Sequence, residues 1–211
     1  MNEGVLPIMW ALWIGAIPVS YLLGCINPSI MTAKAKGVDI RKEGSGNPGT
    51  TNTLRVLGKK YAALVLLVDI LKGVLAVLLG KFVGLELLGL WTFGELLPYA
   101  CGLAAFCGHV WPAFYGFRGG KGVATGFGVL AAIHPIMGFS CLAVAILVVL
   151  VSRRVSVATL SAAASAPVFT WLWEPDFFLW CLALVIIVFV KHRANLRRLM
   201  AGTEPKLSFK K

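Results

Sequence analysis

One polar stretch stands out in a chain that is otherwise mostly apolar: residues 43–52, which read Glu-Gly-Ser-Gly-Asn-Pro-Gly-Thr-Thr-Asn. Its glycines allow backbone N–H groups to turn toward one point, and its short hydroxyl and amide side chains suit phosphate or polyol oxygens. The sequence therefore predicts an anion-binding loop. Basic residues flank it on both sides, namely Arg41, Lys42, Arg55, Lys59 and Lys60.

The spacing Gly44-x-Gly46-x-x-Gly49 also satisfies the glycine fingerprint of dinucleotide-binding proteins. That fingerprint has meaning only between a strand and a helix of a βαβ unit, with an acidic residue about 20 residues further on. Here long apolar segments lie on either side of it. We set the dinucleotide interpretation aside, and the remaining alternative to an anion site is a flexible polar loop between two helices.

Two further clusters combine basic residues with glycines or amides. In the second, residues 109–125, the run Gly-Gly-Lys-Gly at 119–122 precedes a predicted helix start, where unpaired N–H groups and the helix dipole attract anions. The third, residues 191–198, reads Lys-His-Arg-Ala-Asn-Leu-Arg-Arg. Each alone is compatible with an ordinary basic loop. Together, with glycines that let backbone approach a ligand, they favour a shared phosphate site.

The elements that must position these clusters are predicted to be membrane helices. The 211 residues are 58% hydrophobic and 14% charged, whereas soluble domains have roughly 45–50% and about 25%. A spanning helix needs about 20 mostly apolar residues. We predict an all-α, polytopic integral membrane protein with seven transmembrane helices. They lie at about 5–32, 61–80, 98–114, 155–171 and 177–190, with two more in 123–151 separated by a turn at His134-Pro135.

The positive charges predict how these helices are oriented. With the N-terminus outside and the C-terminus cytoplasmic, 18 of the 20 Lys and Arg residues fall on the cytoplasmic side, leaving Lys72 in a span and Lys81 outside. This bias explains the formal net charge of +11 without a nucleic-acid partner. We expect a single membrane domain, 1–211, with cytoplasmic motif segments 33–60, 115–122 and 191–211. Residues 85–97 are predicted to form an outer loop or a partly inserted helix.

Charged residues inside a span are costly, and two of them lie three residues apart at Asp69 and Lys72. On a helix they share a face and can pair. They are either a structural ion pair or groups that help to order the anion site. The five cysteines are scattered in apolar stretches, and no pair of the nine acidic residues has metal-ligand spacing. We expect no disulfide framework, no metal and no other cofactor.

Three motifs resemble, in order and spacing, those of the bacterial acyl-phosphate:glycerol-3-phosphate acyltransferases, the PlsY type. They are residues 44–52, residues 116–125 and His192-Arg193-x-Asn195-x-x-Arg198. Residues 69–73 and Gly108-His109 look like that family too. The resemblance covers nearly the whole chain. One departure is Cys25, where the family usually has serine.

The resemblance implies transfer of a fatty acyl group from acyl phosphate to the 1-hydroxyl of sn-glycerol 3-phosphate. The products would be lysophosphatidate and phosphate, in the first step of phospholipid synthesis. The implied protein is a multi-pass protein of the bacterial inner (plasma) membrane, with its active site facing the cytoplasm. Its partners would be long-chain acyl phosphate, glycerol 3-phosphate and the lipid bilayer. Docking of the soluble enzyme that forms acyl phosphate stays open.

The resemblance also implies roles for individual residues. Arg55, Lys121 and Arg193 would clamp phosphate, and Ser45 would lie at the reacting oxygens. His192 is the first candidate for a protein base and His109 the second, although either can be structural and the leaving phosphate can itself accept the proton. The catalytic candidates are Ser45, Lys121 and His192. The substrate-binding candidates are Gly46, Asn47, Asn52, Arg55, His109, Gly119, Gly120, Arg193 and Asn195.

Two other classes of membrane protein remain as alternatives. A transporter of anionic solutes also has charges inside spans and a basic anion site, but it typically has interrupted helices in matching halves and a site at the midplane. Another kind of lipid enzyme is the second alternative. The His-x-x-x-x-Asp motif of acyl-CoA acyltransferases is absent, because Phe114, Phe139 and Arg197 stand five residues after the three histidines. The Asp-rich motif of metal-dependent alcohol phosphotransferases is absent as well.

Overall fold

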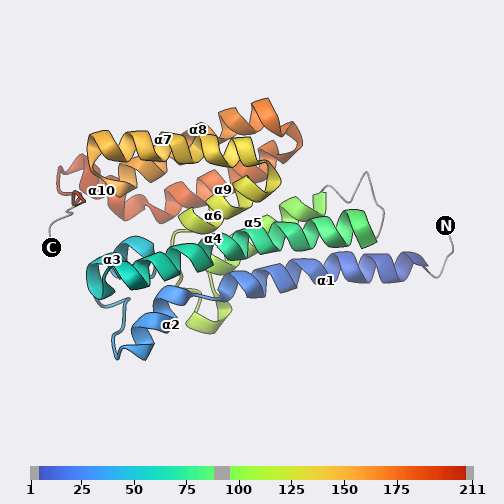
Figure 1. Ribbon diagram of the computed structural model, residues 1–211, viewed down its shortest axis with the longest axis horizontal. Coiled ribbons are helices and arrows are strands. Elements are labelled where there is room, and N and C mark those ends of the chain that lie inside the picture. The colour runs from blue at the N-terminus through green and yellow to red at the C-terminus, as the bar shows by residue number, and fades with distance from the viewer. Residues whose placement is uncertain (1–4, 88–95, 208–211) are drawn as a thin grey trace. The chain divides into compact units, whose positions relative to one another are not determined.

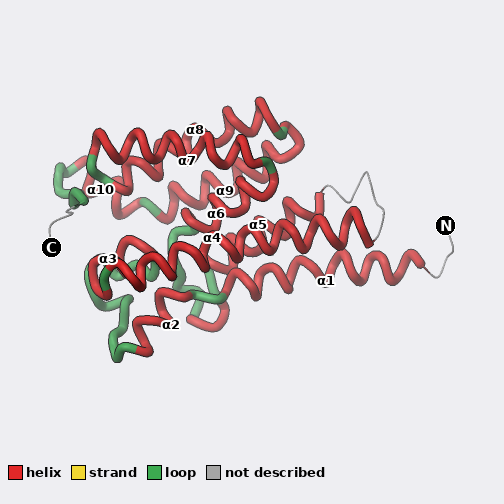
Figure 2. The backbone as a smooth tube through the Cα atoms, in the orientation of Figure 1, coloured by secondary structure: helices red, strands yellow, loops and turns green. Residues whose placement is uncertain are grey.

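The computed structural model describes residues 5–87 and 96–207, and every regular element in these ranges is a helix (Figures 1 and 2). The all-helical prediction is thus confirmed for the described part of the chain. Two compact units divide the chain after Ile133. Most of the predicted outer loop at 85–97 falls on residues 88–95, which lie outside the described ranges.

The first unit carries two of the three polar clusters. Its long helix α4 packs against α5 and α6, and α1 packs against α5. The elements in chain order are α1 (Val5–Cys25), α2 (Pro28–Ala35), α3 (Thr50–Leu57), α4 (Lys59–Lys81), a π-helical turn η1 (Phe82–Leu87), α5 (Leu96–Val110), a 3₁₀ turn η2 (Ala113–Tyr115) and α6 (Val123–Ile133).

The first predicted span, 5–32, is a broken helix in the structure. Proline disfavours a helical conformation in the residue before it, and Asn27 accordingly adopts extended backbone (φ −114°, ψ 93°) ahead of Pro28. Asn27 then caps the next helix, because its Oδ1 accepts the Ile30 N–H at 3.0 Å. By contrast, Pro18 lies inside α1 without ending it. The chain therefore turns at residues 26–27, directly before the first polar segment.

Helix α6, which follows the second polar cluster, is fixed to α4 near both of its ends. A Cβ atom on Gly73 of α4 would collide with the Thr125 carbonyl, and one on Gly128 of α6 would collide with the α4 backbone. Small residues allow this close approach of membrane helices, whose association depends on packing. At the other end, Lys81 donates to the Ala132 carbonyl at 2.8 Å and satisfies one of the unpaired carbonyls of the helix terminus.

The second unit carries the third polar cluster. Helix α7 (Pro135–Ser152) packs along α8 (Val155–Trp173), and α8 packs along α9 (Phe178–Lys191). The predicted turns at His134-Pro135 and at 173–176 are confirmed by the helix boundaries. The elements are α7 (Pro135–Ser152), α8 (Val155–Trp173), a 3₁₀ turn η3 (Pro175–Phe177), α9 (Phe178–Lys191) and α10 (Arg193–Met200).

Several of these helices meet the requirements for crossing a membrane. Within the described residues, four segments are long and apolar enough: Ile14–Ala35, Lys59–Gly84, Pro135–Ser152 and Val155–Trp173. A fifth is obtained if the bent pair Pro175–Lys191 and Arg193–Met200 counts as one span. The helices in the remaining predicted spans are α5, with 15 residues, and α6, with 11, which are shorter than a full crossing requires. The count of seven and the orientation of the termini stay predictions.

Candidate functional site

The first glycine-rich loop is organised around one buried amide. Asn52 is 1% exposed, and its Oδ1 accepts the Ser45 N–H at 2.8 Å. Its Nδ2 donates to the carbonyls of Ile40 at 3.1 Å and Glu43 at 2.9 Å. Both donor hydrogens of the amide and its acceptor are therefore engaged within the loop. Asn52 shapes the loop, and its predicted contact with substrate stays a prediction.

The backbone of this loop turns where the sequence predicted. Gly46 has φ +68°, and a Cβ atom there would lie 3.0 Å from the Arg41 carbonyl oxygen, so a side chain would be strained and crowded. Ser45 is exposed and Asn47 is half-buried, and Arg55 is exposed one helical turn into α3. Ser45 and Arg55 are thus accessible at the surface of the first unit.

The second glycine-rich loop is attached to the end of α5. The Gly119 N–H donates to the Val110 carbonyl at 3.2 Å, and the Gly120 N–H donates to the His109 carbonyl at 3.1 Å. A Cβ atom on Gly120 would collide with the His109 ring at Nε2 and lie 3.0 Å from the carbonyl oxygen of Pro48. Pro48 belongs to the first loop, so the structure brings the first two polar clusters together at Gly120.

Lys121 follows this contact point directly. It is half-buried and stands two residues before α6 begins at Val123. The first N–H groups of a helix have no intrahelical acceptor, and together with the helix dipole they attract anions. A lysine at this position can add a full positive charge to that field, as the predicted phosphate clamp requires.

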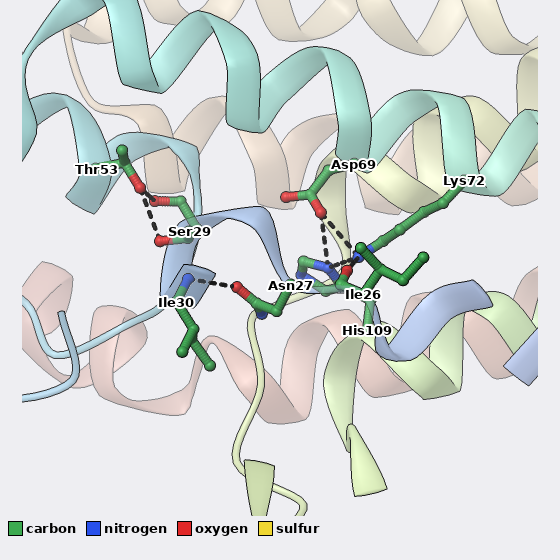
Figure 3. Close-up of polar contacts among 9 residues, drawn as sticks. Ile26, Asn27, Ser29, Ile30, Thr53, Asp69, Lys72 and His109 are labelled. Carbon is green, nitrogen blue, oxygen red and sulfur yellow. Dashed lines mark hydrogen bonds and ion pairs between the residues drawn. The ribbon is translucent and has the colours of Figure 1, made fainter. Parts of the chain in front are cut away.

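Asp69, Lys72 and His109 form a buried charge cluster (Figure 3). The predicted ion pair is confirmed, with Lys72 Nζ 2.8 Å from Asp69 Oδ1 and both side chains 2% exposed. His109 comes from α5, and its Nδ1 is 2.8 Å from Lys72 Nζ and 3.2 Å from Asp69 Oδ1. Lys72 also donates to the Ile26 carbonyl at 2.8 Å. Because its Nδ1 is engaged within this cluster, a positioning role suits His109 better than the role of base.

In the second unit, the third motif begins at the junction of α9 and α10. His192 is 3% exposed, and its Nδ1 is 2.8 Å from the Val188 carbonyl oxygen. A carbonyl can only accept, so Nδ1 carries a proton and donates a hydrogen bond to this oxygen. Arg193 is exposed at the first position of α10.

Glu204, which the sequence analysis did not single out, holds this motif together. It is 8% exposed and accepts from Asn195 Nδ2 at 2.6 Å and from Arg198 Nε at 2.7 Å. Burial raises the pKa of the Glu204 carboxyl, but the polar side chains of Ser156, Asn195 and Arg198 outweigh it and hold that pKa below its usual range. A sequence signal was present, since Glu204 is the last acidic residue and stands alone in a basic tail.

The predicted site residues thus fall into two groups. The first unit holds Ser45, Gly46, Asn47, Asn52, Arg55, His109, Gly119, Gly120 and Lys121. The second unit holds His192, Arg193 and Asn195. Among the described residues, no group of three or more His, Cys, Asp or Glu side chains is arranged to hold a metal ion. What each group offers is phosphate chemistry: exposed or half-buried cations beside backbone that can approach an anion.

Comparison with known proteins identifies similar chains over nearly the full length. Residues 14–202 match the family model for glycerol-3-phosphate acyltransferase. The glycerol-3-phosphate acyltransferase of Clostridioides difficile (strain 630) is 45% identical over 195 residues, which cover 92% of this chain and 94% of that protein. The one from Thermoanaerobacter sp. (strain X514) is 40% identical over 195 residues, with 91% and 94% covered.

Two solved structures have the same fold. Both are of PlsY (YgiH), an integral membrane glycerol 3-phosphate acyltransferase. The glycerol 3-phosphate form has a TM-score of 0.84 and 35% identity, and covers 93% of this chain and 96% of the other. The lysophosphatidic acid form has a TM-score of 0.81 and 34% identity, with 93% and 95% covered.

Proposed function

The chain belongs to the glycerol-3-phosphate acyltransferase family, and on that premise we propose that it transfers a fatty acyl group from acyl phosphate to the 1-hydroxyl of sn-glycerol 3-phosphate. The products are lysophosphatidate and inorganic phosphate. The PlsY structures were solved in glycerol 3-phosphate and lysophosphatidic acid forms, which supports the same acceptor and product here. The resemblance of the three motifs to acyl-phosphate-dependent enzymes supports the donor.

One observation carries the proposal: the two glycine-rich loops meet at Gly120, with Pro48 on one side and Lys121 next in sequence. Both substrates of the reaction carry a phosphate group. A site for them needs cations and backbone N–H groups in one place. Lys121 beside this contact, followed by the first N–H groups of α6, supports such a site.

The reaction needs little covalent chemistry from the protein. The glycerol oxygen attacks the acyl carbonyl carbon, a new C–O bond forms, and the C–O bond to phosphate breaks so that phosphate leaves with the electron pair. Lys121, Arg55 and Arg193 stabilise the phosphate charges, and Ser45 and the Gly46 backbone lie at the reacting oxygens. The hydroxyl proton goes either to His192 or to the leaving phosphate.

The same proposal gives the protein its place in the cell. Several apolar helices support an integral membrane protein. The distribution of Lys and Arg supports a bacterial inner-membrane location with the site facing the cytoplasm. The proposed partners are glycerol 3-phosphate, long-chain acyl phosphate and the surrounding lipid. Whether the soluble enzyme that forms acyl phosphate docks on the basic cytoplasmic segments stays an open question.

The test is turnover by the purified protein in lipid. With palmitoyl phosphate, we expect phosphate release and lysophosphatidate formation that depend on sn-glycerol 3-phosphate. Lys121→Ala should lower kcat/KM on the order of 10²-fold or more, because it removes a charge that stabilises phosphate in the transition state. Palmitoyl-CoA and palmitoyl-acyl carrier protein serve as donor controls. Turnover with either of these and none with palmitoyl phosphate would contradict the donor, and no turnover with any donor would contradict the activity.

A further inference from the structure

The buried charge cluster calls for an explanation beyond stability. Withdrawing Asp69 and Lys72 from water costs free energy that their attraction often does not recover, and apolar side chains of similar volume frequently serve stability as well or better. Neither side chain is placed to touch a substrate, because each is 2% exposed. Lys72 contacts two irregular points of the chain: the Ile26 carbonyl at the break between α1 and α2, and the His109 ring at the end of α5.

The first of these points is the break between α1 and α2. The Ile26 carbonyl stands at the break, where the helix hydrogen-bond pattern is interrupted, and Lys72 donates to it at 2.8 Å. One turn beyond, Ser29 Oγ is 2.8 Å from Thr53 Oγ1, which ties α2 to α3 (Figure 3). Helix α3 begins at Thr50, directly after the first glycine-rich loop. Lys72 therefore supports one side of the first glycine-rich loop indirectly: it holds the Ile26 carbonyl at the break, and α2, which follows the break, is tied to α3.

The second point is the end of α5. The ring of His109 is held at Nδ1 by the cluster and faces Gly120 with Nε2, while the His109 carbonyl accepts the Gly120 N–H. The ring and the Pro48 carbonyl oxygen both border Gly120 on the side where a Cβ atom would point, so both limit the space there. The position of the ring therefore determines how closely the two loops approach.

We propose that Lys72, neutralised by Asp69, is a positioning residue for the reaction: its ammonium group fixes the Ile26 carbonyl and the His109 ring together and thereby sets the spacing of the two glycine-rich loops around the phosphate groups. This role deepens the proposed function and rests on it. The geometry requires a donor at Lys72 Nζ, whereas Asp69 serves mainly to balance the charge.

A double variant separates positioning from charge balance. Asp69→Asn/Lys72→Met removes both charges and leaves no unpaired buried ion, so we expect it to fold with a Tm close to that of the wild type. We expect kcat/KM for glycerol 3-phosphate to fall on the order of 10²-fold, because small misplacements of binding groups have effects of that size. Asp69→Asn/Lys72→Gln keeps an N–H donor without the charge and should recover at least roughly tenfold of that loss.

Lys81→Met is the matched control. Lys81 also lies in α4 and also donates to a backbone carbonyl at 2.8 Å, but at the end of α6 remote from the loops. We expect this variant to lower the Tm while leaving kcat/KM unchanged within about twofold, since the loops keep their supports. A comparable loss of activity in Lys81→Met would show that any weakening of α4 has the same effect, and would overturn the proposal.

Hydrogen exchange gives a readout that is independent of turnover. In Asp69→Asn/Lys72→Met, peptides covering residues 116–123 should exchange faster than in the wild type and in Lys81→Met. The His109 ring that borders Gly120 is then no longer held by Lys72, so the hydrogen bond from the Gly120 N–H to the His109 carbonyl should open more often. Unchanged exchange there overturns the positioning role whatever the activity, and faster exchange with full activity overturns it too. Failure of the wild type to turn over palmitoyl phosphate would overturn the proposed function instead, and the exchange result would still decide whether Lys72 positions the loop.

Discussion

At the scale of single residues, two buried polar side chains direct their hydrogen bonds into the motif segments that they hold. Asn52 engages three backbone groups of the first glycine-rich loop, and Glu204 engages Asn195 and Arg198 of the third motif. Buried polar groups that lose a partner cost free energy, so both residues hold their loops in a single arrangement. Motif residues can therefore matter without touching a ligand.

Gly120 is the position where the two glycine-rich loops come into contact. Gly120→Ala adds a methyl group that collides with the His109 ring and crowds the Pro48 carbonyl, so the two loops must separate. We expect a loss in kcat/KM on the order of 10²-fold, measured as lysophosphatidate formation from palmitoyl phosphate. Gly15→Ala in α1 is the matched control, because its added methyl group meets nothing within 4 Å. Equal activity of the two variants would contradict the tight contact at Gly120.

Glu204→Gln tests the third motif through the pH dependence of stability. The variant keeps an oxygen for Asn195 but loses the charge opposite Arg198, so its Tm in detergent should be lower at neutral pH. The folded-state pKa of Glu204 is below the unfolded value of about 4.3, so the stabilisation is complete above the unfolded pKa and is lost as the pH falls through the folded pKa. The two Tm curves should converge as the pH is lowered from about 5 toward 3. A gap that widens over that range would count against the prediction.

At the scale of elements, a helix break and a helix end provide backbone attachments for the two glycine-rich loops. The break at residues 26–27 exposes a carbonyl for Lys72, and the end of α5 supplies carbonyls for Gly119 and Gly120. Irregular backbone at membrane depth is tolerated where protein groups satisfy it. If α1 had continued without the break and α5 had continued past Val110, neither glycine-rich loop would have these backbone attachments.

The cap at Asn27 is the testable part of this arrangement. Asn27→Ala removes the acceptor for the Ile30 N–H at the start of α2, which should destabilise the protein by about 1 kcal/mol. Asn27→Ser retains a capping oxygen and should recover most of that loss. Thermal unfolding in detergent measures both variants. If Ala and Ser give the same Tm, the cap does not stabilise the break.

At the scale of the whole molecule, the predicted orientation follows from charge. Lys36 and Lys206 belong to segments predicted on the cytoplasmic side, and Asp176 belongs to a turn predicted outside. The first unit carries the first two motifs and the second unit carries the third, and the positive-inside rule predicts the cytoplasmic side for all three. Orientation is therefore a functional question as well as a structural one.

Cysteine labelling tests that orientation. In a background without the five native cysteines, Lys36→Cys and Lys206→Cys should react with a membrane-impermeant maleimide only in inside-out vesicles. Asp176→Cys should react only in right-side-out vesicles, because the positive-inside rule places the basic segments opposite it. Labelling of residues 36 and 206 from opposite sides would rule out a common cytoplasmic site.

The sequence by itself determined the helical class, the family and most helix boundaries. Apolar runs reveal membrane helices because lipid admits few other structures, and the turn at His134-Pro135 follows from local backbone chemistry. The three motifs favour phosphate binding, which stays a prediction, because small polar and basic residues seldom gather in apolar chains for another reason. The ion pair of Asp69 and Lys72 was predicted from helix spacing alone.

Only the tertiary structure decided what those residues contact. His109 joins Asp69 and Lys72 because α4 and α5 pack together, and Pro48 reaches Gly120 because two loops separated by some seventy residues converge. Glu204 acquires its partners through the fold of the tail. Such contacts depend on distances between segments far apart in the chain, which residue types and local spacing do not encode.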